Sequence, residues 1–352
     1  MSRKLLIDIF LVSTVAMAVA GTALAQKDDD VAVSSTNSEQ PAPNVLQAGG
    51  IDEAVLQAQV MLDRAGFAPG VIDGHKGMSF DEAVKGFQTS RGLEVTGELD
   101  GPTKAVLFQD SFPVTRELRV ASTDALGPFV ESIPKDPADQ ARMDCLCYRN
   151  LLEKLAEKFH TTPDTIVALN DPSLPLEAGT VLRLPNVLPS SRSYANVKPE
   201  AAQMLSDLNV SGDAPKAARI VVDKSDGVLR LFAKDGRLLA QFPATMGSSH
   251  DPLPIGTWKV TSIAYNPPFH YQPDLFWDVA DTKDEQKLPP GPNGPVGTVW
   301  IDLSKEHYGI HGTSEPQTIQ RAQSHGCVRL TNWDAARVSQ MVADGMEVIF
   351  QA

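Results

Sequence analysis

The sequence predicts a multi-domain protein with a three-helix module, a small α+β module and a mostly-β, sandwich-like C-terminal domain. Three observations support this prediction. The chain has 352 residues, a length that suits two or three domains. Apolar residues recur at helical spacing between residues 51 and 108. From residue 219 onward, short apolar runs alternate with turn signals, a pattern typical of strands joined by hairpins.

The overall composition is that of an ordinary globular protein. Hydrophobic residues make up 42% of the chain, which excludes collagen-like, wholly disordered and multi-span membrane classes. The 31 Lys and Arg residues are outnumbered by 44 Asp and Glu residues, which gives a net charge of −13. A nucleic-acid partner is therefore not expected, because phosphate contacts need Lys and Arg. The three cysteines are too few for a disulfide-stapled scaffold.

Residues 1–25 are predicted to be a secretory signal peptide. Arg3 and Lys4 form a positively charged start, Leu5–Ala20 is mostly apolar, and Ala23–Ala25 gives an A-x-A cleavage site. We expect cleavage to leave an exported protein without a membrane span. Residues 26–50 are predicted to be a disordered tether, because they hold almost no large apolar residues that could offset the entropy of ordering.

Residues 51–110 are predicted to form the helical module. Val55, Gln59 and Leu62 open an amphipathic helix, and Ser79 with Glu82 forms a capping box for a second helix. A third helix is expected from about residue 101 to residue 108. The loops resemble those of the peptidoglycan-binding type 1 domain through the motifs Gly66-Phe67-x-Pro69-Gly70-x-Ile72-Asp73-Gly74, Ala83-Val84-x-x-Phe87-Gln88 and Gly92-Leu93-x-x-x-Gly97. That resemblance implies a three-helix fold and contact with peptidoglycan.

Residues 111–143 are predicted to be a linker, and residues 144–188 the small α+β module. Apolar residues at helical spacing predict one helix from about Leu151, Thr162 or Pro163 opens a second, and residues 179–185 form a strand. The module resembles a glycan-binding LysM module at Leu169-Asn170, Ala178-Gly179 and Leu184-Pro185. No opening strand is recognised, and Cys145-x-Cys147 stands in its place. Residues 189–217 are predicted to be a second linker.

The Cys145-x-Cys147 pair leaves three interpretations open. A disulfide between residues two apart closes a small, strained ring, although an oxidising compartment permits it. Reduced thiols and a bond to a partner are the other two. Cys327 is then the odd cysteine, and an unpaired thiol in an exported protein makes sense chiefly if it must react.

Residues 218–352 are predicted to form the mostly-β domain. Asp226-Gly227 and Asp235-Gly236 are hairpin turn signals, and one helix begins after the capping residue Thr331. The strands are expected at residues 219–223, 228–233, 238–244, 257–263, 299–303, 308–311 and 347–350.

A short segment near the C-terminus carries candidate chemistry. His311-Gly312-Thr313 precedes Ser324-His325-Gly326-Cys327-Val328-Arg329-Leu330 in the chain. A free thiol is only a few per cent ionised at neutral pH, and a neighbouring imidazole can accept its proton or, as imidazolium, can hold the thiolate. Gly312 and Gly326 let the backbone approach a substrate closely. Arg329 lies two residues beyond Cys327 on an extended chain, so it would share that face and could pair with a carboxylate.

This pair of motifs resembles the signature of the YkuD-type L,D-transpeptidase catalytic domain, over residues 218–352. The resemblance implies a sandwich-like β fold that acts on peptidoglycan stem peptides and glycan without a metal or organic cofactor. It implies that Cys327 attacks the L-centre carbonyl of the third-position diamino acid in a tetrapeptide stem and expels D-Ala. An amine acceptor then resolves the thioester. The acceptor stays open: another stem peptide, a protein lysine such as that of an outer-membrane lipoprotein, or water.

The same resemblance assigns roles to the residues around the thiol. His311 would be the general base and then the acid, with its imidazole oriented by the Gly312 carbonyl. Backbone N–H groups at Gly326 and Cys327 would form the oxyanion hole. The remaining residues would shape the pocket or hold substrate: Ser324, His325 and Arg329.

Three other interpretations stand beside this one. A hydrolase would trim stem peptides through the same thioester, and a non-catalytic protein would only bind the wall. A zinc site built from His307, His311, His325 and Cys327 would need His307 and His311 on one strand face. With its signal peptide and wall substrates, the protein is expected in the periplasm or cell envelope.

Overall fold

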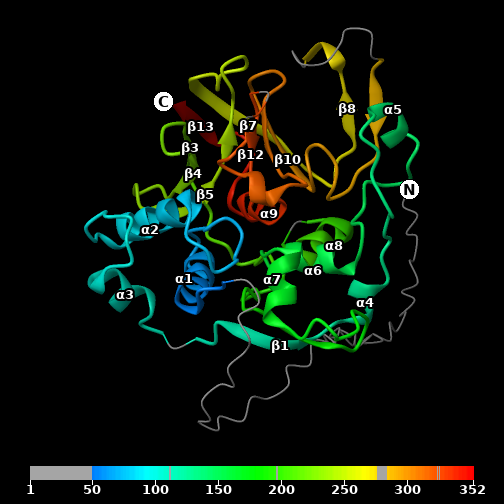
Figure 1. Ribbon diagram of the computed structural model, residues 1–352. Helices are drawn as coiled ribbons and strands as arrows, with labels where there is room; N and C mark the ends of the chain where they lie inside the picture. The colour runs from blue at the N-terminus through cyan, green and yellow to red at the C-terminus, as the bar shows by residue number, and fades with distance from the viewer. Residues whose placement is uncertain (1–49, 111, 196, 276–283, 323, 325) are drawn as a thin grey trace, which may run out of the picture.

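The computed structural model describes residues 50–110, 112–195, 197–275, 284–322, 324 and 326–352 (Figure 1). The predicted signal peptide, all but the last residue of the predicted tether, and His325 lie outside these residues. Within the described ranges, no helix is both long and apolar enough to cross a membrane.

The N-terminal region is the expected three-helix module. It consists of α1 (Glu53–Arg64), α2 (Met78–Arg91) and α3 (Gly101–Leu107). Asp52 caps α1 by accepting hydrogen bonds from the first-turn backbone, and Asp100 caps α3 in the same way. The helices enclose a small apolar core of Leu62, Phe67, Phe80, Val84, Phe87 and Leu107.

The predicted capping box at Ser79 is wrong. Helix α2 begins two residues earlier than a Ser79 cap implies, at Met78, and its N-cap Gly77 makes no side-chain hydrogen bond. The Ser79 hydroxyl instead donates to Gln320 Oε1 at 2.7 Å, in the C-terminal domain. A tertiary contact therefore takes the hydroxyl that local spacing assigns to the helix end.

The segment predicted as a first linker is ordered structure. It holds β1 (Thr115–Arg119), α4 (Ser122–Ala125) and α5 (Pro137–Gln140). Strand β1 pairs antiparallel with β2 (Val181–Pro185), and Leu118 lies opposite Leu182. Strand β1 is thus the opening strand of the small module, and it lies upstream of the Cys145-x-Cys147 segment, which stands where that strand was expected. Its sequence TRELR has a single buried apolar side chain among charged ones, which leaves a weak strand pattern.

Helices α6 (Leu151–Lys158) and α7 (Pro163–Leu169) complete the small module. Asn150 caps α6 and Thr162 caps α7. Their apolar faces share one core with β1, β2 and helix α1 of the helical module, through Leu56, Val60, Leu118, Leu155, Ile166 and Leu182. The two N-terminal modules are therefore packed together.

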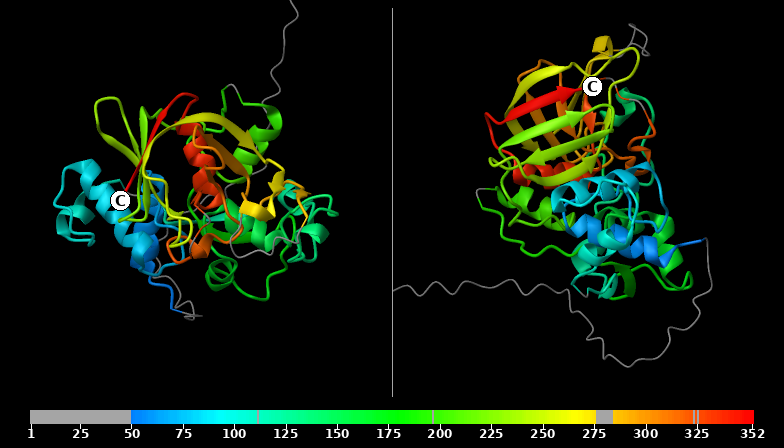
Figure 2. Two further views of the ribbon diagram at one scale, coloured as in Figure 1. Left: turned by 90° about the horizontal axis from the view of Figure 1, so that it is seen from above. Right: turned by 90° about the vertical axis from the view of Figure 1, so that its left-hand side faces the viewer.

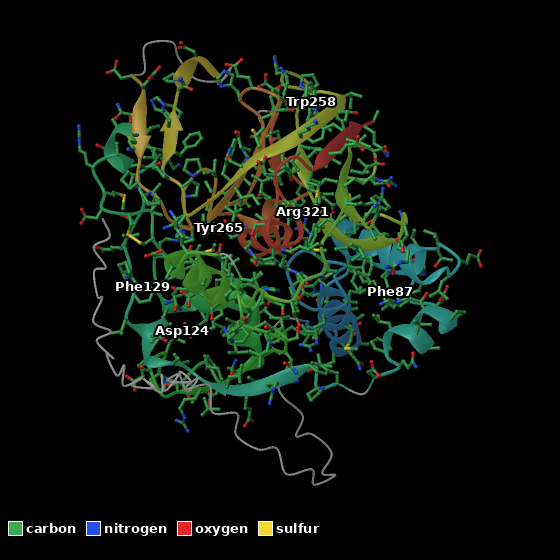
Figure 3. All side chains as sticks on the ribbon, turned by 180° about the vertical axis from the view of Figure 1, so that it is seen from behind. Phe87, Asp124, Phe129, Trp258, Tyr265 and Arg321 are labelled. Carbon is green, nitrogen blue, oxygen red and sulfur yellow. A yellow bond between two sulfur atoms is a disulfide. The ribbon has the colours of Figure 1, made fainter. Side chains whose placement is uncertain are left out.

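The Cys145-x-Cys147 pair is bridged by a disulfide, which settles the question that the sequence leaves open (Figure 3). The residue between the cysteines, Leu146, is fully buried. Its N–H donates to the Pro290 carbonyl, and its carbonyl accepts from the Asn293 N–H. The bridged loop is thus docked on a loop of the C-terminal domain.

The segment predicted as a second linker contains helix α8 (Pro199–Asp207). Leu205, at 0% exposure, and Leu208 and Val210, at 1% each, belong to the apolar core of the C-terminal domain. The prediction of a linker is wrong here because the apolar spacing of this short helix is sparse beside its Pro and polar residues.

The C-terminal domain is built on one nine-stranded sheet and carries helix α9 (Asn332–Met341). The strand order is β5-β4-β3-β13-β7-β10-β11-β12-β6. A separate two-stranded ribbon pairs β8 (Phe269–Tyr271) with β9 (Gln286–Leu288). The strands of the large sheet are β3 (Arg219–Asp223), β4 (Val228–Phe232), β5 (Leu238–Pro243), β6 (Thr245–Met246), β7 (Gly256–Tyr265), β10 (Val299–Leu303), β11 (Gly309–His311), β12 (Val328–Arg329) and β13 (Glu347–Gln351).

The domain is mostly β, as expected, and the two halves of its nine-stranded sheet meet in the long strand β7. Residues 256–259 of β7 pair with β13, and residues 260–265 pair with β10, so β7 belongs to both halves. The two edge strands, β5 and β6, are separated in the chain only by Ala244. The sheet must therefore curl until its edges approach each other (Figure 2).

Helix α9 packs against the curled sheet and helps to form the core. Trp333, Ala335, Ala336 and Val338 are fully buried among the strand side chains. Thr331 caps the helix by accepting from the Asp334 N–H, as its sequence predicts. Because α9 follows β12 directly, it ties the end of the Cys327 segment to the core.

The outer edge of β5 is covered by the helical module. The Gln241 N–H donates to the Gly66 carbonyl at 3.0 Å, and the Ala68 N–H donates to the Gln241 carbonyl at 2.9 Å. The Gln241 side chain also donates to the Glu82 carbonyl in α2. The backbone of the helical module thus pairs with an edge strand of the C-terminal domain.

A buried polar cluster joins all three parts of the molecule. Asp63 of α1 accepts from Arg337 of α9 at 2.8 Å and lies 3.2 Å from His160 Nδ1, at the end of α6. The His160 ring stacks on Trp333, with ring centroids 5.4 Å apart. Arg337 also lies 3.3 Å from Asp334. We call these five residues the junction cluster.

Candidate active site

Two adjacent parallel strands bring the predicted catalytic residues together. Strand β11 pairs with β12, with Ile310 opposite Val328 and His311 opposite Arg329. Ile310 and Val328 point into the core, at 0% exposure each. Because side chains alternate along a strand, His311 and Arg329 share the other face. By the same alternation we expect the side chain of Cys327, which directly precedes β12, on the face of Arg329. Its Sγ donates to the His307 carbonyl at 3.6 Å.

The imidazole of His311 is buried and held from two sides. Its Nδ1 lies 2.7 Å from the Gly312 carbonyl oxygen, the contact that the sequence resemblance implies. Since a carbonyl can only accept, Nδ1 carries the proton and Nε2 is left as the basic nitrogen. The ring stacks on Trp300 of β10, with centroids 5.5 Å apart and planes inclined by 22°. The indole is fixed in turn by a hydrogen bond from its Nε1 to Asp302 at 3.2 Å.

Burial sets the protonation states of the pair. It lowers the pKa of His311 to about 3, helped by the nearby Arg329 cation, while the Gly312 hydrogen bond acts in the opposite direction. Burial also raises the pKa of the Cys327 thiol, against a backbone hydrogen bond from Gly309 and the attraction of Arg329. Both groups are therefore neutral near pH 7. Such a pair can act as thiol and general base rather than as a preformed ion pair.

The loop before β12 is shaped by Ser324 and Gly326. The Ser324 hydroxyl donates to the Cys327 carbonyl at 2.7 Å and accepts from the Gly247 N–H at 2.6 Å. Gly326 has a φ of +95°, and a Cβ there would lie 2.8 Å from the Tyr308 ring. Only glycine fits both conditions. These residues fix the backbone on which the thiol is carried.

Three side chains at the site have no part in the sequence motifs. Trp300 lies against His311, and a Cβ on Gly309 would clash with its indole. Tyr308 lies near Cys327, and its phenol pKa is raised first by burial and then by the charge of the Cys327 thiolate. Asn332 packs against the backbone of Gly312. The sequence places Trp300 and Tyr308 in predicted strands and Asn332 two residues beyond the motif, but no pattern in it links them to Cys327 or His311.

Arg329 acts electrostatically on both His311 and Cys327. Burial lowers its pKa, while Cys327 and Glu315 act in the opposite direction. It lies directly opposite His311 in the strand register. A partly buried guanidinium on the thiol's face can bind a carboxylate through two hydrogen bonds.

The geometry required by the zinc interpretation is not met at His307. That residue has a φ of +63° and precedes β11, which begins at Gly309, so it shares no strand face with His311. Its Nε2 lies 3.6 Å from Glu306, in an exposed position. Among the residues that the structure describes, which omit His325, no group of three His, Cys, Asp or Glu side chains is placed to hold a metal ion.

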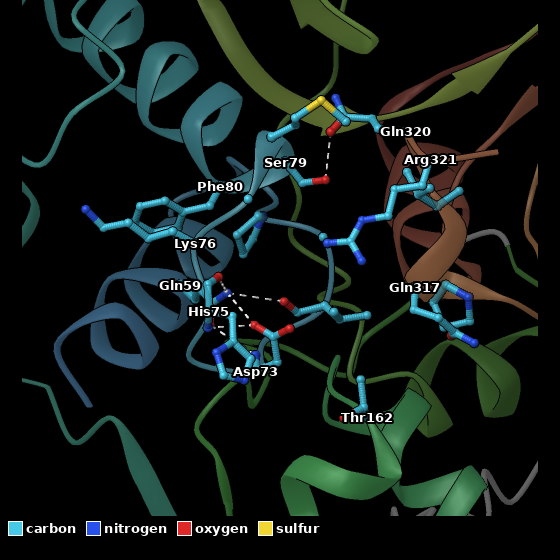
Figure 4. A pocket seen from close by; sticks show the side chains of 17 residues that line it. Gln59, Asp73, His75, Lys76, Ser79, Phe80, Thr162, Gln317, Gln320 and Arg321 are labelled. Carbon is cyan, nitrogen blue, oxygen red and sulfur yellow. Dashed lines mark hydrogen bonds between the residues drawn. The ribbon is translucent and has the colours of Figure 1, made fainter. Parts of the chain in front are cut away.

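The loop that leads to Cys327 also borders a cavity of about 110 Å³ (Figure 4). Its walls come from the helical module, from Thr162, and from residues 316–321 of the C-terminal domain. Gln320 spans the two sides, since it accepts from Ser79 and donates to the Gly227 carbonyl at 2.8 Å. Gln59 holds the opposite wall through the Asp73 and Gly74 N–H groups. The helical module therefore braces the segment before the thiol.

Two family models match the chain. Residues 217–350 match the L,D-transpeptidase catalytic domain. Residues 52–107 match a model described as "Putative peptidoglycan binding domain".

Two Bacillus proteins, each named "Putative L,D-transpeptidase YkuD", are similar in sequence. The protein of Bacillus licheniformis is 32% identical over 130 residues, which cover 37% of this chain and 63% of the relative. The protein of Bacillus subtilis is 47% identical over 57 residues, which cover 16% of this chain and 35% of the relative. The chain thus spans less than two thirds of the length of either relative.

Solved structures give weaker overall likenesses. An L,D-transpeptidase from Mycobacterium smegmatis aligns at 23% identity with a TM-score of 0.32, over 40% of this chain and 60% of that one. An L,D-transpeptidase from Xylanimonas cellulosilytica aligns at 16% identity with a TM-score of 0.36, over 89% and 100%. The family matches therefore carry the comparison: residues 217–350 are similar to the L,D-transpeptidase catalytic domain, and residues 52–107 are similar to a putative peptidoglycan-binding domain.

Proposed function

We propose that this protein is a peptidoglycan L,D-transpeptidase with Cys327 as its nucleophile and His311 as its general base. The observation that carries the proposal is the shared face of β11 and β12. There the Gly312 carbonyl holds the proton on His311 Nδ1 and leaves Nε2 as the basic nitrogen. The match of this domain to the L,D-transpeptidase catalytic family supports the reaction class.

In the first half-reaction, His311 Nε2 takes the thiol proton as Cys327 Sγ attacks the L-centre carbonyl of the third stem residue. The tetrahedral intermediate collapses by breaking the C–N bond to D-Ala. The imidazolium returns its proton to the leaving amine, and a thioester remains on Cys327. A neutral starting pair suits this sequence, because the base must be unprotonated before attack.

Substrate contacts are assigned to the residues around the thiol. Backbone N–H groups at Gly326 and Cys327 form the oxyanion hole, since the loop bends sharply at Gly326. Arg329 binds a substrate carboxylate, and Ser324 holds the loop in shape. The motif resemblance also assigns His325, which lies outside the described residues, a part in shaping the pocket.

The second half-reaction transfers the acyl group to an acceptor. His311 removes a proton from the incoming amine, which attacks the thioester, and Cys327 leaves as the thiol. An amine on a second stem peptide would give a cross-link, and a lysine of an outer-membrane lipoprotein would attach that protein to the wall. Water as acceptor would make the enzyme a carboxypeptidase.

The N-terminal modules hold the enzyme on the wall. The match of residues 52–107 to a peptidoglycan-binding family supports this role for the helical module. Residues 144–188, with the added strand β1, form a LysM-like βααβ arrangement that contacts glycan. Binding through these modules raises the local concentration of stem peptides. The protein works in the cell envelope, after export by its N-terminal segment.

Incubation of the purified protein with a disaccharide-tetrapeptide, read by mass spectrometry, tests the proposal. We expect a cross-linked dimer and released D-Ala from the wild type, and neither product from Cys327→Ser or His311→Ala. The single variants and the double variant should lose activity to a similar extent, because the two residues act as one unit.

The other outcomes separate the alternatives. Tripeptide without dimer would identify a carboxypeptidase. Products that persist in Cys327→Ser would overturn the assigned nucleophile. Binding to isolated peptidoglycan without any Cys327-dependent product would leave a non-catalytic wall protein.

A further inference from the structure

The amide of Asn332 connects the active site to the small module. This residue begins α9 and is fully buried. Its Oδ1 accepts from the Thr298 N–H at 3.1 Å. Its Nδ2 donates to both carboxylate oxygens of Glu157, at 2.8 and 3.1 Å, and to the Pro292 carbonyl at 3.0 Å. Glu157 lies on α6, outside the catalytic domain.

Asn332 also lies in close contact with the backbone that orients His311. A Cβ placed on Gly312 would collide with Asn332 Oδ1, and so would a Cβ placed on Gly297. The amide therefore fills the space between these two glycines. Because the Gly312 carbonyl receives the His311 Nδ1 proton, the position of the Asn332 amide bears on the position of the imidazole.

Glu157 is buried among neutral hydrogen-bond donors. Besides Asn332, it accepts from the Tyr148 hydroxyl at 3.0 Å. Burial raises the pKa of Glu157 to about 8. Burying a carboxyl group costs free energy of folding unless its oxygens are hydrogen-bonded. Asn332 donates to both oxygens, and Glu157 is in turn an acceptor for the buried amide hydrogens of Asn332.

We propose that Glu157, from the small module, is a positioning residue for His311 and acts through Asn332 and Gly312. This proposal rests on the proposed transpeptidase function. Without an acceptor at residue 157, Asn332 Nδ2 keeps only the Pro292 carbonyl, and one of its buried amide hydrogens loses its partner. The amide would shift to regain a hydrogen bond, and the Gly312 backbone packed against it would shift with it.

The consequence for catalysis is a misplaced base. A displacement of about 1 Å at a catalytic group costs on the order of 100-fold in rate. Substrate binding depends instead on Arg329 and the loop before β12, which Glu157 does not touch. The turnover number kcat should therefore fall while KM changes little.

Three substitutions at residue 157 test the proposal in the full-length protein. Glu157→Leu introduces an apolar side chain of similar size and removes the acceptor, so kcat should fall by roughly 10-fold to 100-fold. Glu157→Gln keeps an oxygen acceptor for Asn332 and should restore kcat to within about 3-fold. Should Glu157→Leu not fold, Glu157→Asp keeps the carboxyl group on a shorter side chain and should give an intermediate kcat at unchanged KM.

Asp124→Asn is the matched control. Asp124 is another buried carboxylate of the same module, and its ion pairs, with Lys158 at 2.8 Å and with Lys154 at 3.9 Å, are to residues of α6. If loss of activity only reflected a loosened module, this variant would lower kcat as Glu157→Leu does. We expect its kcat and KM to match the wild type.

A second measurement does not depend on turnover. In protein labelled with ¹⁵N-histidine, the Nδ1 proton of His311 should give a resonance shifted by its bond to the Gly312 carbonyl. This signal should change in Glu157→Leu and persist in Glu157→Gln and Asp124→Asn. A wild type without turnover would overturn the proposed function, and this signal would still decide the positioning role. An unchanged signal and an unchanged kcat in Glu157→Leu would overturn the present proposal.

Discussion

At the scale of single residues, the site shows a thiol and an imidazole that are both neutral near pH 7. Burial lowers the pKa of His311 to about 3 and raises that of Cys327. The sequence alone indicated a thiol activated by an imidazole, either as a base or as an imidazolium. Buried surroundings on both sides favour the first of these, because burial disfavours each charged form.

Alkylation of Cys327 by iodoacetamide tests the neutral pair. Because the thiolate is the reactive form and its pKa is raised, the rate constant should climb without a plateau from about pH 6 to pH 9. His311→Ala should leave this profile in place. A plateau below about pH 7 that disappears in His311→Ala would show an ion pair instead.

The motif residues were predictable from the sequence, whereas the residues that hold them in place, such as Trp300 and Glu157, were not. Cys327 and His311 stand in compact motifs whose residue types carry the chemistry. Trp300 and Glu157 reach His311 or its backbone from a neighbouring strand and from another module. No spacing along the chain relates them to the motif, so only the folded structure reveals them.

At the scale of elements, the hairpin strands were predicted well and the isolated elements poorly. Strands β3 and β10 have the expected bounds, because turn signals or dense apolar runs define them. Strand β1 and helix α8 lie in segments predicted as linkers. Each owes its order to packing against residues distant in the chain, Leu182 for β1 and the catalytic core for α8. Local patterns do not record such contacts.

The place of α8 in the catalytic core can be tested with Leu205→Ala. Leu205 has 0% exposure, so the truncation should lower the free energy of unfolding by about 2–5 kcal/mol, measured by urea denaturation. Gln203→Ala, at an exposed position of the same helix, should cost well under 1 kcal/mol, as is usual for surface sites. Equal small losses in both variants would show that α8 is only a linker.

Helix α6 should make the stability of the protein pH-dependent through Glu157. Its folded-state pKa of about 8 lies above the ordinary value of 4.5, so the neutral form is favoured by folding. This contribution is fully present below pH 4.5 and is lost as the pH rises through about 8. Glu157→Gln should therefore show a smaller fall in Tm between these limits, read by circular dichroism. The exposed control Glu94→Gln should keep the wild-type slope, and an equal slope in Glu157→Gln would contradict the assignment.

At the scale of the whole molecule, the three parts form one packed body. The modules were expected to be joined by linkers, yet the junction cluster joins α1, α6 and α9 in a buried site. The pKa of Asp63 falls to about 2, against the cost of burial, because Arg337 and His160 stabilise its charge. The helical module is thereby held at a fixed place beside the C-terminal domain.

Removal of the cation at the junction should weaken this union. Arg337→Ala leaves Asp63 and Asp334 buried without their guanidinium partner, which should cost about 3–5 kcal/mol. In differential scanning calorimetry, we expect a lower Tm and a separation into more than one transition. Arg142→Ala breaks only an exposed pair with Asp139 and should leave the single transition in place. An unaltered thermogram for Arg337→Ala would show that the parts are joined elsewhere.

The pairing of Gln241 with Gly66 and Ala68 has a practical consequence. Strand β5 is an edge strand, and the helical module occupies hydrogen-bonding groups that would otherwise be open. A shortened protein that began near residue 217 would expose the outer edge of β5 to solvent, including the amide and carbonyl groups of Gln241. Open edges of this kind recruit strands from other copies, so such a fragment would self-associate. By covering this edge strand, the helical module should therefore also reduce aggregation of the C-terminal domain.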